Sequence, residues 1–391
     1  MRDPRFSAVA ACAALVVLSA CSAGAVRDVV TPDEGTPKDS IVLTANVAPK
    51  ADGVEVKTIV SASATHGIIS TARLATVDGK TTIAGSVAGS SWVAGDRLEP
   101  STTYRLSVTG RGDDGKEQTL SRTFSTQALS LAQQTYPSVA PLRGETVGVG
   151  MPVIVTFDVP VKNRALFERN MTVESTPAVR GSWDWFSDRE VHFRPQTFWP
   201  AHARVNVSLR LNGLPAGGGV YGQQDQDIDF KVGREIISVV NIAKHRLKYT
   251  VDGRVGKTIP VTTGDSGHAT REGTKVIMEK FSSIDMDAAT TGVDSEDPGY
   301  YNIKDVRWAM RVTNSGEFLH AAPWSVGAQG SANVSHGCTG MSTADAAWLF
   351  QHSRRGDVVR YVNGSRQLED RNGWTDWNVP WSEWVRGSAL S

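Results

Sequence analysis

One short segment near the end of the chain combines a cysteine with a histidine, in the order Ser335-His336-Gly337-Cys338. A second histidine, His320, ends a mainly apolar segment further upstream. A thiolate is a good nucleophile, but a free thiol has a pKa of about 8.5, so it needs a base or a positive dipole nearby. Extended backbone points alternate residues to one side, which would bring His336 next to Cys338.

The residues around this cysteine could also serve the rest of an acyl transfer. A capping box formed by Ser342 and Asp345 predicts a helix just after the cysteine, with its positive end directed back toward the thiol. Gly337 would let a substrate come close, and the neighbouring backbone amides could stabilise an oxyanion. This segment therefore predicts covalent catalysis through a thioester on Cys338.

Two other uses of the cysteine were weighed. A structural zinc site needs about four ligands, and no second cysteine lies at a Cys-x-x-Cys spacing from Cys338. The remaining histidines, His245, His268 and His352 among them, are not at ligand spacings either. A buried, inert thiol is the stronger alternative, but two histidine segments and a helix start favour reactivity. We expect no metal and no other cofactor.

The N-terminus indicates export. Arg2 and Arg5 precede a short apolar run over residues 8–20, too short for the roughly 20 residues of a membrane span but typical of a signal peptide. The run ends in Leu18-Ser19-Ala20-Cys21, which resembles a bacterial lipobox with Cys21 as the lipidated residue. We therefore expect a signal peptide over residues 1–20, a tether over 21–39 and an extracytoplasmic, lipid-anchored protein. Simple secretion is the alternative.

Composition narrows the function classes. The 391 residues contain 41 basic and 41 acidic side chains, so the chain lacks the positive surplus that tracks a phosphate backbone, and nucleic acid is excluded as a partner. Of the three cysteines, Cys12 would leave with the signal peptide and Cys21 would carry lipid, which leaves Cys338 without a disulfide partner. A lone thiol in an oxidising compartment is either inert or kept for its chemistry.

The elements that must position this chemistry are mainly β. Alternating segments and Gly-containing turns predict two tandem immunoglobulin-like β-sandwiches, over residues 40–128 and 129–234. The second would use Trp183, Trp185 and Phe193 in its core. A catalytic domain over residues 235–365 would contain strands near 236–242, 246–251, 257–262, 306–312 and 317–320, with a long loop at 282–301. A Trp-rich C-terminal segment follows at 366–391.

Together these motifs resemble the L,D-transpeptidase family, in its actinobacterial, mycobacterial-type form. The resemblance rests on the Ser335–Cys338 segment with His320 upstream, on residues 325–330 between the histidines, on Arg355-Gly356-Asp357, and on residues 376–381. The resemblance implies a mainly β catalytic domain with a short helix after the nucleophile. It also implies peptidoglycan stems as substrates and carbapenem β-lactams as inhibitors.

The family's mechanism assigns further roles. Cys338 would attack the third residue, meso-diaminopimelate, of a donor tetrapeptide stem, release D-Ala, and pass the acyl group to a second stem as a 3→3 cross-link. His320 would be the base, oriented by the backbone carbonyl of Ala321, and His336 would shape the site. The resemblance also implies a lid over residues 282–301 and a set of substrate-binding residues: Tyr301, Phe318, Trp324, Ser335, Gly337 and Gly340. Water as acceptor would give L,D-carboxypeptidase activity.

One position departs from the family. Many members have Asn two residues after the nucleophile, where this chain has Gly340. The missing amide predicts a weaker hold on donor stems or β-lactams, and it leaves a catalytically weak, cell-wall-binding lipoprotein as an alternative. The four C-terminal tryptophans, finally, are predicted to anchor the end of the chain onto the catalytic domain rather than to stack on glycan.

Overall fold

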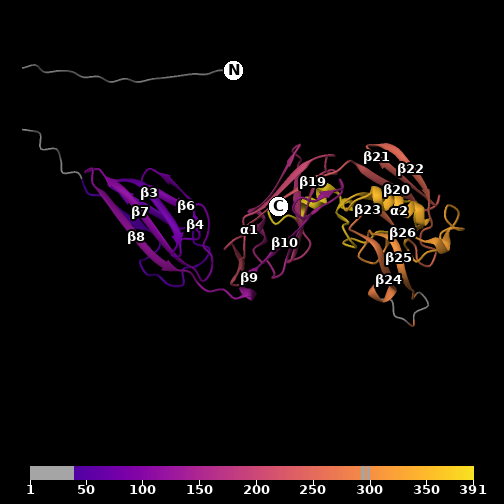
Figure 1. Cartoon of the computed structure of the whole chain (residues 1–391), viewed down its shortest axis with the longest axis horizontal. Helices are drawn as coiled ribbons and strands as arrows, with labels where there is room; N and C mark the ends of the chain where they lie inside the picture. Colours follow the sequence, from indigo (N-terminus) through magenta and orange to yellow (C-terminus); the bar gives the residue numbers. More distant parts are fainter. Residues whose placement is uncertain (1–38, 292–295, 297–299) are drawn as a thin grey trace, which may run out of the picture.

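The computed structural model describes residues 39–291, 296 and 300–391. The predicted signal peptide, Cys12 and Cys21 lie outside the described residues. Figure 1 shows one sandwich at one end of the molecule, with the second sandwich and the catalytic region beyond it. The described chain is built mainly from β-strands with few helices, which confirms the predicted class. Among the described residues, no helix is both long enough and apolar enough to span a membrane.

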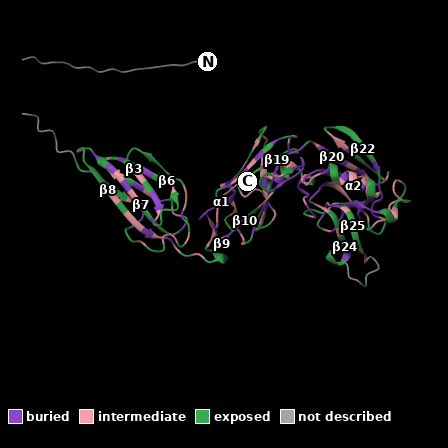
Figure 2. Ribbon diagram, viewed as in Figure 1, coloured by how far each residue is buried: buried purple, intermediate pink, exposed green. Residues whose placement is uncertain are grey.

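The first sandwich consists of two four-stranded sheets, in the orders β1-β2-β6-β5 and β4-β3-β7-β8. Figure 2 shows the buried residues between them. Trp92 and Tyr104 are the largest side chains of this core, which burial of large apolar area stabilises. Outside these strands, Val54 makes an isolated bridge to Thr126. The strands are β1 (Val42–Ala45), β2 (Ser61–Thr65), β3 (Gly67–Thr76), β4 (Thr82–Ile83), β5 (Gly85–Ala88), β6 (Ser91–Ala94), β7 (Thr103–Gly112) and β8 (Glu117–Ser125).

The second sandwich pairs the sheets β10-β12-β15-β14 and β11-β19-β16-β13, with a small third sheet β17-β18-β9 at one end. Trp183, Trp185 and Phe193 are buried in its core, as expected. The elements are η1 (Leu131–Gln133), β9 (Gln134–Thr135), β10 (Pro137–Ala140), β11 (Thr146–Val147), β12 (Val153–Phe157), α1 (Arg164–Glu168), β13 (Met171–Thr176), β14 (Gly181–Trp185), β15 (Glu190–Pro195), β16 (Arg204–Leu209), β17 (Pro215–Gly217), β18 (Val220–Gly222) and β19 (Gln226–Val232).

The third unit contains two sheets, a six-stranded one in the order β22-β21-β20-β28-β23-β29 and a four-stranded one in the order β24-β25-β26-β27. Leu349 of helix α2 is buried in the core with strand residues from both sheets. The elements are β20 (Ile236–Asn241), β21 (Arg246–Val251), β22 (Arg254–Pro260), β23 (Arg271–Val276), β24 (Glu279–Asp287), η2 (Ala288–Thr291), β25 (Asn302–Arg311), β26 (Phe318–Ala321), η3 (Pro323–Ser325), β27 (Thr339–Met341), α2 (Thr343–His352), β28 (Val358–Val362) and β29 (Arg366–Gln367).

The first part of the expected loop at 282–301 is a strand. Residues up to Asp287 belong to β24, which pairs antiparallel with β25 from Glu279 opposite Arg311 to Asp287 opposite Asn302. Ser282, Ser283 and Asp285 occupy exposed positions of this hairpin, while Met286 is buried. Composition misled the prediction because an exposed strand face tolerates polar residues. Residues 292–295 and 297–299 of the expected lid lie outside the described residues.

The tryptophans of the C-terminal segment pack mainly on the second sandwich, so the prediction that they anchor it onto the catalytic domain was wrong. The segment contains η4 (Asp376–Asn378), α3 (Trp381–Trp384) and η5 (Val385–Gly387). The indole of Trp377 donates to the Gly150 carbonyl at 2.7 Å, and that of Trp384 donates to the Ser182 carbonyl at 2.9 Å. The guanidinium of Arg194 lies 4.7–5.3 Å from the ring centroids of Trp377, Trp381 and Trp384. The tryptophans therefore pack, as predicted, but against a different domain.

A buried histidine completes this interface. The Nδ1 atom of His192 lies 3.0 Å from Asp376, and its Nε2 atom lies 3.0 Å from Glu190. Burial of the His192 ring opposes a positive charge on it. The negative charges and hydrogen bonds of Asp376 and Glu190 outweigh this effect of burial and raise the pKa of His192 to about 9. Carboxylates accept on both sides of the ring, so His192 is protonated at neutral pH.

This pKa predicts a pH-dependent docking of the C-terminal segment. Because the folded pKa exceeds the unfolded value, the ionic contribution is complete below about pH 6.5 and is lost as the pH rises through about 9. We expect the melting temperature to fall across this window, by about 2–4 °C for each kcal/mol lost. The fall should be absent in Asp376→Asn.

Asp370→Asn is the matched control, because its carboxylate is exposed on the same segment. It should keep the pH dependence of the wild type. Parallel melting curves for wild type and Asp376→Asn between pH 6.5 and 9.5 would contradict this assignment.

Candidate active site

The cysteine and the predicted base lie on adjacent strands. β26 and β27 pair in parallel, with His320 opposite Gly340 and Leu319 opposite Thr339. Cys338 immediately precedes β27, so the register brings the two side chains to the same end of the sheet. On its other edge, Gly340 exchanges backbone hydrogen bonds of 2.9 Å with Thr262. The segment that carries Cys338 is thus held by the main chain of its two neighbours.

Cys338 is a buried thiol, 8% exposed, within an apolar cluster that includes Met286, Val306 and Phe318. Its sulfur donates to the carbonyl oxygen of Gly316 at 3.5 Å. Burial raises the pKa of the thiol to about 12, although a backbone hydrogen bond from Phe318 acts in the opposite direction. The resting cysteine is therefore a neutral thiol, and it would need a base in order to act as a nucleophile.

His320 is fixed in the state that a base requires. Its Nδ1 atom donates to the carbonyl oxygen of Ala321 at 2.8 Å, the carbonyl expected from the sequence. Since a carbonyl can only accept, the proton of the neutral ring is on Nδ1 and Nε2 is free to accept one. Burial lowers the pKa of His320 below its ordinary value. The imidazole is therefore neutral at physiological pH.

One cavity of about 470 Å³ contains most of the residues singled out from the sequence. It is lined by Tyr301, His320, Trp324, Ser335, His336, Cys338 and Gly340, together with eight residues that sequence reasoning did not assign, among them Thr262, Met286, Ile303, Ala322 and Ser325. Phe318, Ala321 and Gly337 do not line it. Phe318 packs instead behind the cysteine, with the guanidinium of Arg311 4.5 Å from its ring centroid.

His336 lies at the mouth of the cavity. It is exposed, and its ring centroid is 4.4 Å from that of His268 and 5.2 Å from that of Tyr301. Burial raises the pKa of Tyr301 to about 12, so its hydroxyl remains a neutral donor. The arrangement places His336 where a substrate would enter, which is compatible with the shaping role expected for it.

The segment before the cysteine is organised by its own polar groups. Ser335 donates through Oγ to the Cys338 carbonyl at 2.6 Å and accepts from the Gly337 amide at 3.2 Å. Gly337 has a φ of +115°, a conformation that side chains rarely adopt. The amides of Gly337 and Gly340 are thus already engaged, which removes two of the expected oxyanion donors. Helix α2 begins at Thr343 with Ser342 as its N-cap, as predicted, and β27 lies between it and Cys338.

Comparisons with known proteins agree with this geometry. Residues 235–360 match the L,D-transpeptidase catalytic domain, and residues 51–215 match a bacterial Ig domain. The chain is 36% identical over 366 residues to L,D-transpeptidase 2 of Mycobacterium tuberculosis. This match covers 92% of this chain and 88% of that protein. The chain belongs to the L,D-transpeptidase family.

Two further relatives share the family. The chain is 38% identical over 298 residues to L,D-transpeptidase 5 of M. tuberculosis, covering 74% of this chain and 64% of that protein. This chain also resembles the solved structure of the L,D-transpeptidase LdtMt1 in complex with imipenem, with 34% sequence identity and a TM-score of 0.52. The superposed part covers 57% of this chain and 97% of the LdtMt1 chain. The resemblance seen in the sequence is confirmed: the protein is an L,D-transpeptidase that acts on peptidoglycan and works outside the cytoplasm.

In this L,D-transpeptidase, close packing accounts for Gly340. A Cβ atom added there would lie 2.8 Å from the Cβ of Ala322 and 3.1 Å from the Cγ2 of Thr262. Ala322 has no flexible side chain to move aside, so any larger residue must displace backbone. An asparagine at this position would therefore not fit without rearrangement, whatever its amide offered to a substrate.

We predict that Gly340→Ala destabilises the enzyme by about 1–3 kcal/mol, the usual range for an overpacked site. The rate of acylation by a carbapenem should fall as well, because β27 would shift relative to His320. Gly327→Ala is the matched control, since Gly327 lines the same cavity and an added Cβ would meet nothing within 4 Å. Denaturant unfolding and the second-order acylation rate test both. A Gly340→Ala protein with wild-type stability and rate would show that the strands tolerate a side chain here.

Proposed function

We propose that this enzyme forms 3→3 cross-links between peptidoglycan stems through a thioester on Cys338. The supporting observation is that a buried thiol and a neutral, oriented histidine line one cavity. The sulfur would attack the carbonyl of the third residue of a donor tetrapeptide, and the bond to the terminal D-Ala would break. The side-chain amine of meso-diaminopimelate in a second stem would then take the acyl group and free the sulfur.

His320 carries the protons in this scheme. Its Nε2 atom accepts the thiol proton as the sulfur attacks, and it gives that proton to the departing amine of D-Ala. In the second half-reaction it accepts a proton from the attacking amine and returns one to the sulfur. The hydrogen bond to Ala321 holds the ring orientation throughout, and burial keeps the ring neutral between turnovers.

The cavity supports binding of a peptide stem. The β24–β25 hairpin contributes Tyr301, Met286 and Ile303 to the wall of the cavity. Trp324, whose surface is 56% exposed, also lines it. We assign Tyr301, Trp324, Ser335 and Gly340 to the substrate surface, with His336 at its mouth. Phe318 and Gly337 would act from behind, by fixing the cysteine. The same thiol would be the site of acylation by carbapenems, as the imipenem complex of a relative suggests for this chain.

The remaining domains would place this chemistry at the cell wall. We propose that Cys21 carries a lipid, that residues 21–39 form a tether, and that sandwiches over 40–128 and 129–234 hold the catalytic domain of 235–365 away from the membrane. The C-terminal segment, residues 366–391, would join that domain to the second sandwich, through contacts such as that of Trp384 with Ser182.

We predict that Cys338→Ser and His320→Ala each abolish formation of cross-linked dimer from a disaccharide-tetrapeptide. The serine variant lacks an accessible anion, and the alanine variant lacks the base. Mass spectrometry of the products separates the 3→3 dimer from the tripeptide that an L,D-carboxypeptidase would release.

His352→Ala is the matched control for the histidine. His352 lies at the end of α2, exposed, and its Nδ1 donates to the Trp348 carbonyl at 2.7 Å. Its loss should leave turnover within about twofold of wild type. Dimer formation by Cys338→Ser, or a greater loss in His352→Ala than in His320→Ala, would refute the proposed roles.

We predict that Cys21→Ala releases the protein from membranes and prevents labelling by a radioactive fatty acid. Cys12→Ala is the control and should remain labelled. If Cys21→Ala is still labelled, the lipid is attached elsewhere.

A further inference from the structure

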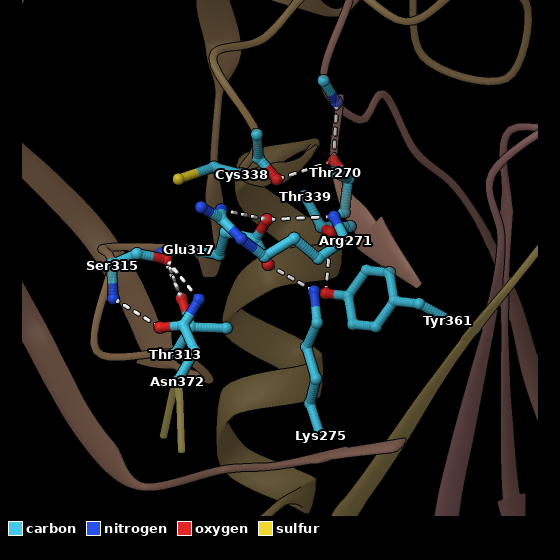
Figure 3. A network of polar contacts seen from close by, with 12 residues as sticks. Thr270, Arg271, Lys275, Thr313, Ser315, Glu317, Cys338, Thr339, Tyr361 and Asn372 are labelled. Carbon is cyan, nitrogen blue, oxygen red and sulfur yellow. Dashed lines mark hydrogen bonds and ion pairs between the residues drawn. The ribbon is translucent and has the colours of Figure 1, made fainter. Parts of the chain in front are cut away.

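A buried network of charged side chains lies beside Cys338 (Figure 3). Lys275, only 1% exposed, forms an ion pair with Glu317, and its Nζ atom is 3.8 Å from the ring centroid of Tyr361. Arg271 donates to the other oxygen of Glu317 from both its backbone amide and its guanidinium, each at 3.1 Å. None of these three side chains lines the cavity.

Glu317 belongs to the segment that holds the sulfur. Its backbone neighbours are Gly316, whose carbonyl accepts from the thiol, and Phe318, whose backbone hydrogen bond reaches the sulfur. The amide of Glu317 donates to Thr313 Oγ1 at 2.9 Å. Asn372 also holds the turn, through hydrogen bonds of 2.9 Å with Ser315. The carboxylate of Glu317 is thus the link between this turn and β23.

The segment on the other side of the sulfur is fixed to the same strand. Thr270, one residue before β23, donates to the Gly337 carbonyl at 2.7 Å and accepts from the Gly264 amide at 2.8 Å. Tyr361, which lies under the ammonium of Lys275, is 2.8 Å from Thr339 through their hydroxyl oxygens. Thr270 and the residues of β23 that follow it therefore bind both the turn that contains Glu317 and the segment that contains Cys338.

The network also carries charge. Two cations, Lys275 and Arg271, share one buried anion, and Arg271 has a second partner only in the half-exposed Glu369. The negative charge of Glu317 raises the pKa of the Cys338 thiol, and the positive charge of Lys275 lowers it by a smaller amount. The other titratable groups toward the cysteine are Arg311 of β25, Tyr301, Tyr361 of β28, His320 of β26 and His336.

Stability gives little reason for such an arrangement. Burying charges costs several kcal/mol per ion, and an apolar replacement of a buried ion pair is often neutral or stabilising. Lys275 occupies a strand position flanked by the buried Val276 and Ile277, where an aliphatic residue would pack without that cost. The charges are better explained by what lies beside them, namely the sulfur.

We propose that Arg271, Lys275 and Glu317 are positioning residues for the nucleophile, which fix both segments around Cys338, with the cations of Lys275 and Arg271 offsetting the carboxylate of Glu317. The inference rests on Cys338 being the nucleophile of the proposed function. The cation of Lys275 favours the anion that forms as the proton passes to His320, in a pocket where burial and Glu317 oppose it.

Alkylation of Cys338 by iodoacetamide across a pH series tests the charge directly, because its rate follows the thiolate fraction. Lys275→Met and Arg271→Gln each remove one positive charge, and each should shift the profile upward by about one pH unit. At fixed pH this slows alkylation about three- to tenfold, since a more basic thiolate is also more nucleophilic. The double variant Lys275→Met/Glu317→Gln restores the net charge and should return the profile toward that of the wild type.

The controls separate charge from folding. Lys275→Arg keeps the cation and should keep the profile, and Lys304→Met removes an exposed lysine, paired with Asp285, and should have no effect. If Lys275→Met does not fold, Arg271→Gln tests the same effect of charge on the alkylation rate. Unshifted profiles in normally melting Lys275→Met or Arg271→Gln, or no recovery in the double variant, would overturn the inference. Shifted profiles in an enzyme that forms no 3→3 dimer would instead overturn the proposed function and leave the network assignment standing.

Discussion

Parallel pairing of β26 with β27 sets the geometry of the active site, because it places His320 opposite Gly340 and Cys338 at the start of the neighbouring strand. The close approach of Thr262 and Ala322 to Gly340 leaves no room for a side chain there. Gly340 is therefore explained by the packing of three segments of chain. The cavity forms on the side of this pairing where the β24–β25 hairpin contributes Met286 and Tyr301.

Burial acts on the cysteine and the histidine in opposite directions, and both effects favour neutral groups. It raises the pKa of the Cys338 thiol and lowers that of His320, so neither group is charged before a substrate arrives. Charge then develops only during the reaction, in a site of low polarity where fixed charges act strongly. The cation of Lys275 would favour the sulfur anion at that moment, against the opposing charge of Glu317.

Features that depend on residues close together in the sequence could be predicted, whereas features that depend on packing between distant segments could not. The Ser335–Cys338 motif, the strands at 246–251 and the capping by Ser342 depend on adjacent residues and could be predicted. The strand at 279–287 was missed because its polar exposed face resembles a loop. The docking of the C-terminal segment on Arg194 and His192 joins residues about 185 apart, which no local pattern encodes. The same holds for the ion pair of Lys275 and Glu317, which are 42 residues apart.

Intact-mass analysis with peptide mapping after exposure to imipenem tests whether Cys338 is the residue that is acylated. We expect a single adduct of the mass of the opened β-lactam, located on the peptide that contains Cys338 and absent from Cys338→Ser. An unmodified wild-type protein, or an adduct on any other residue, would contradict it.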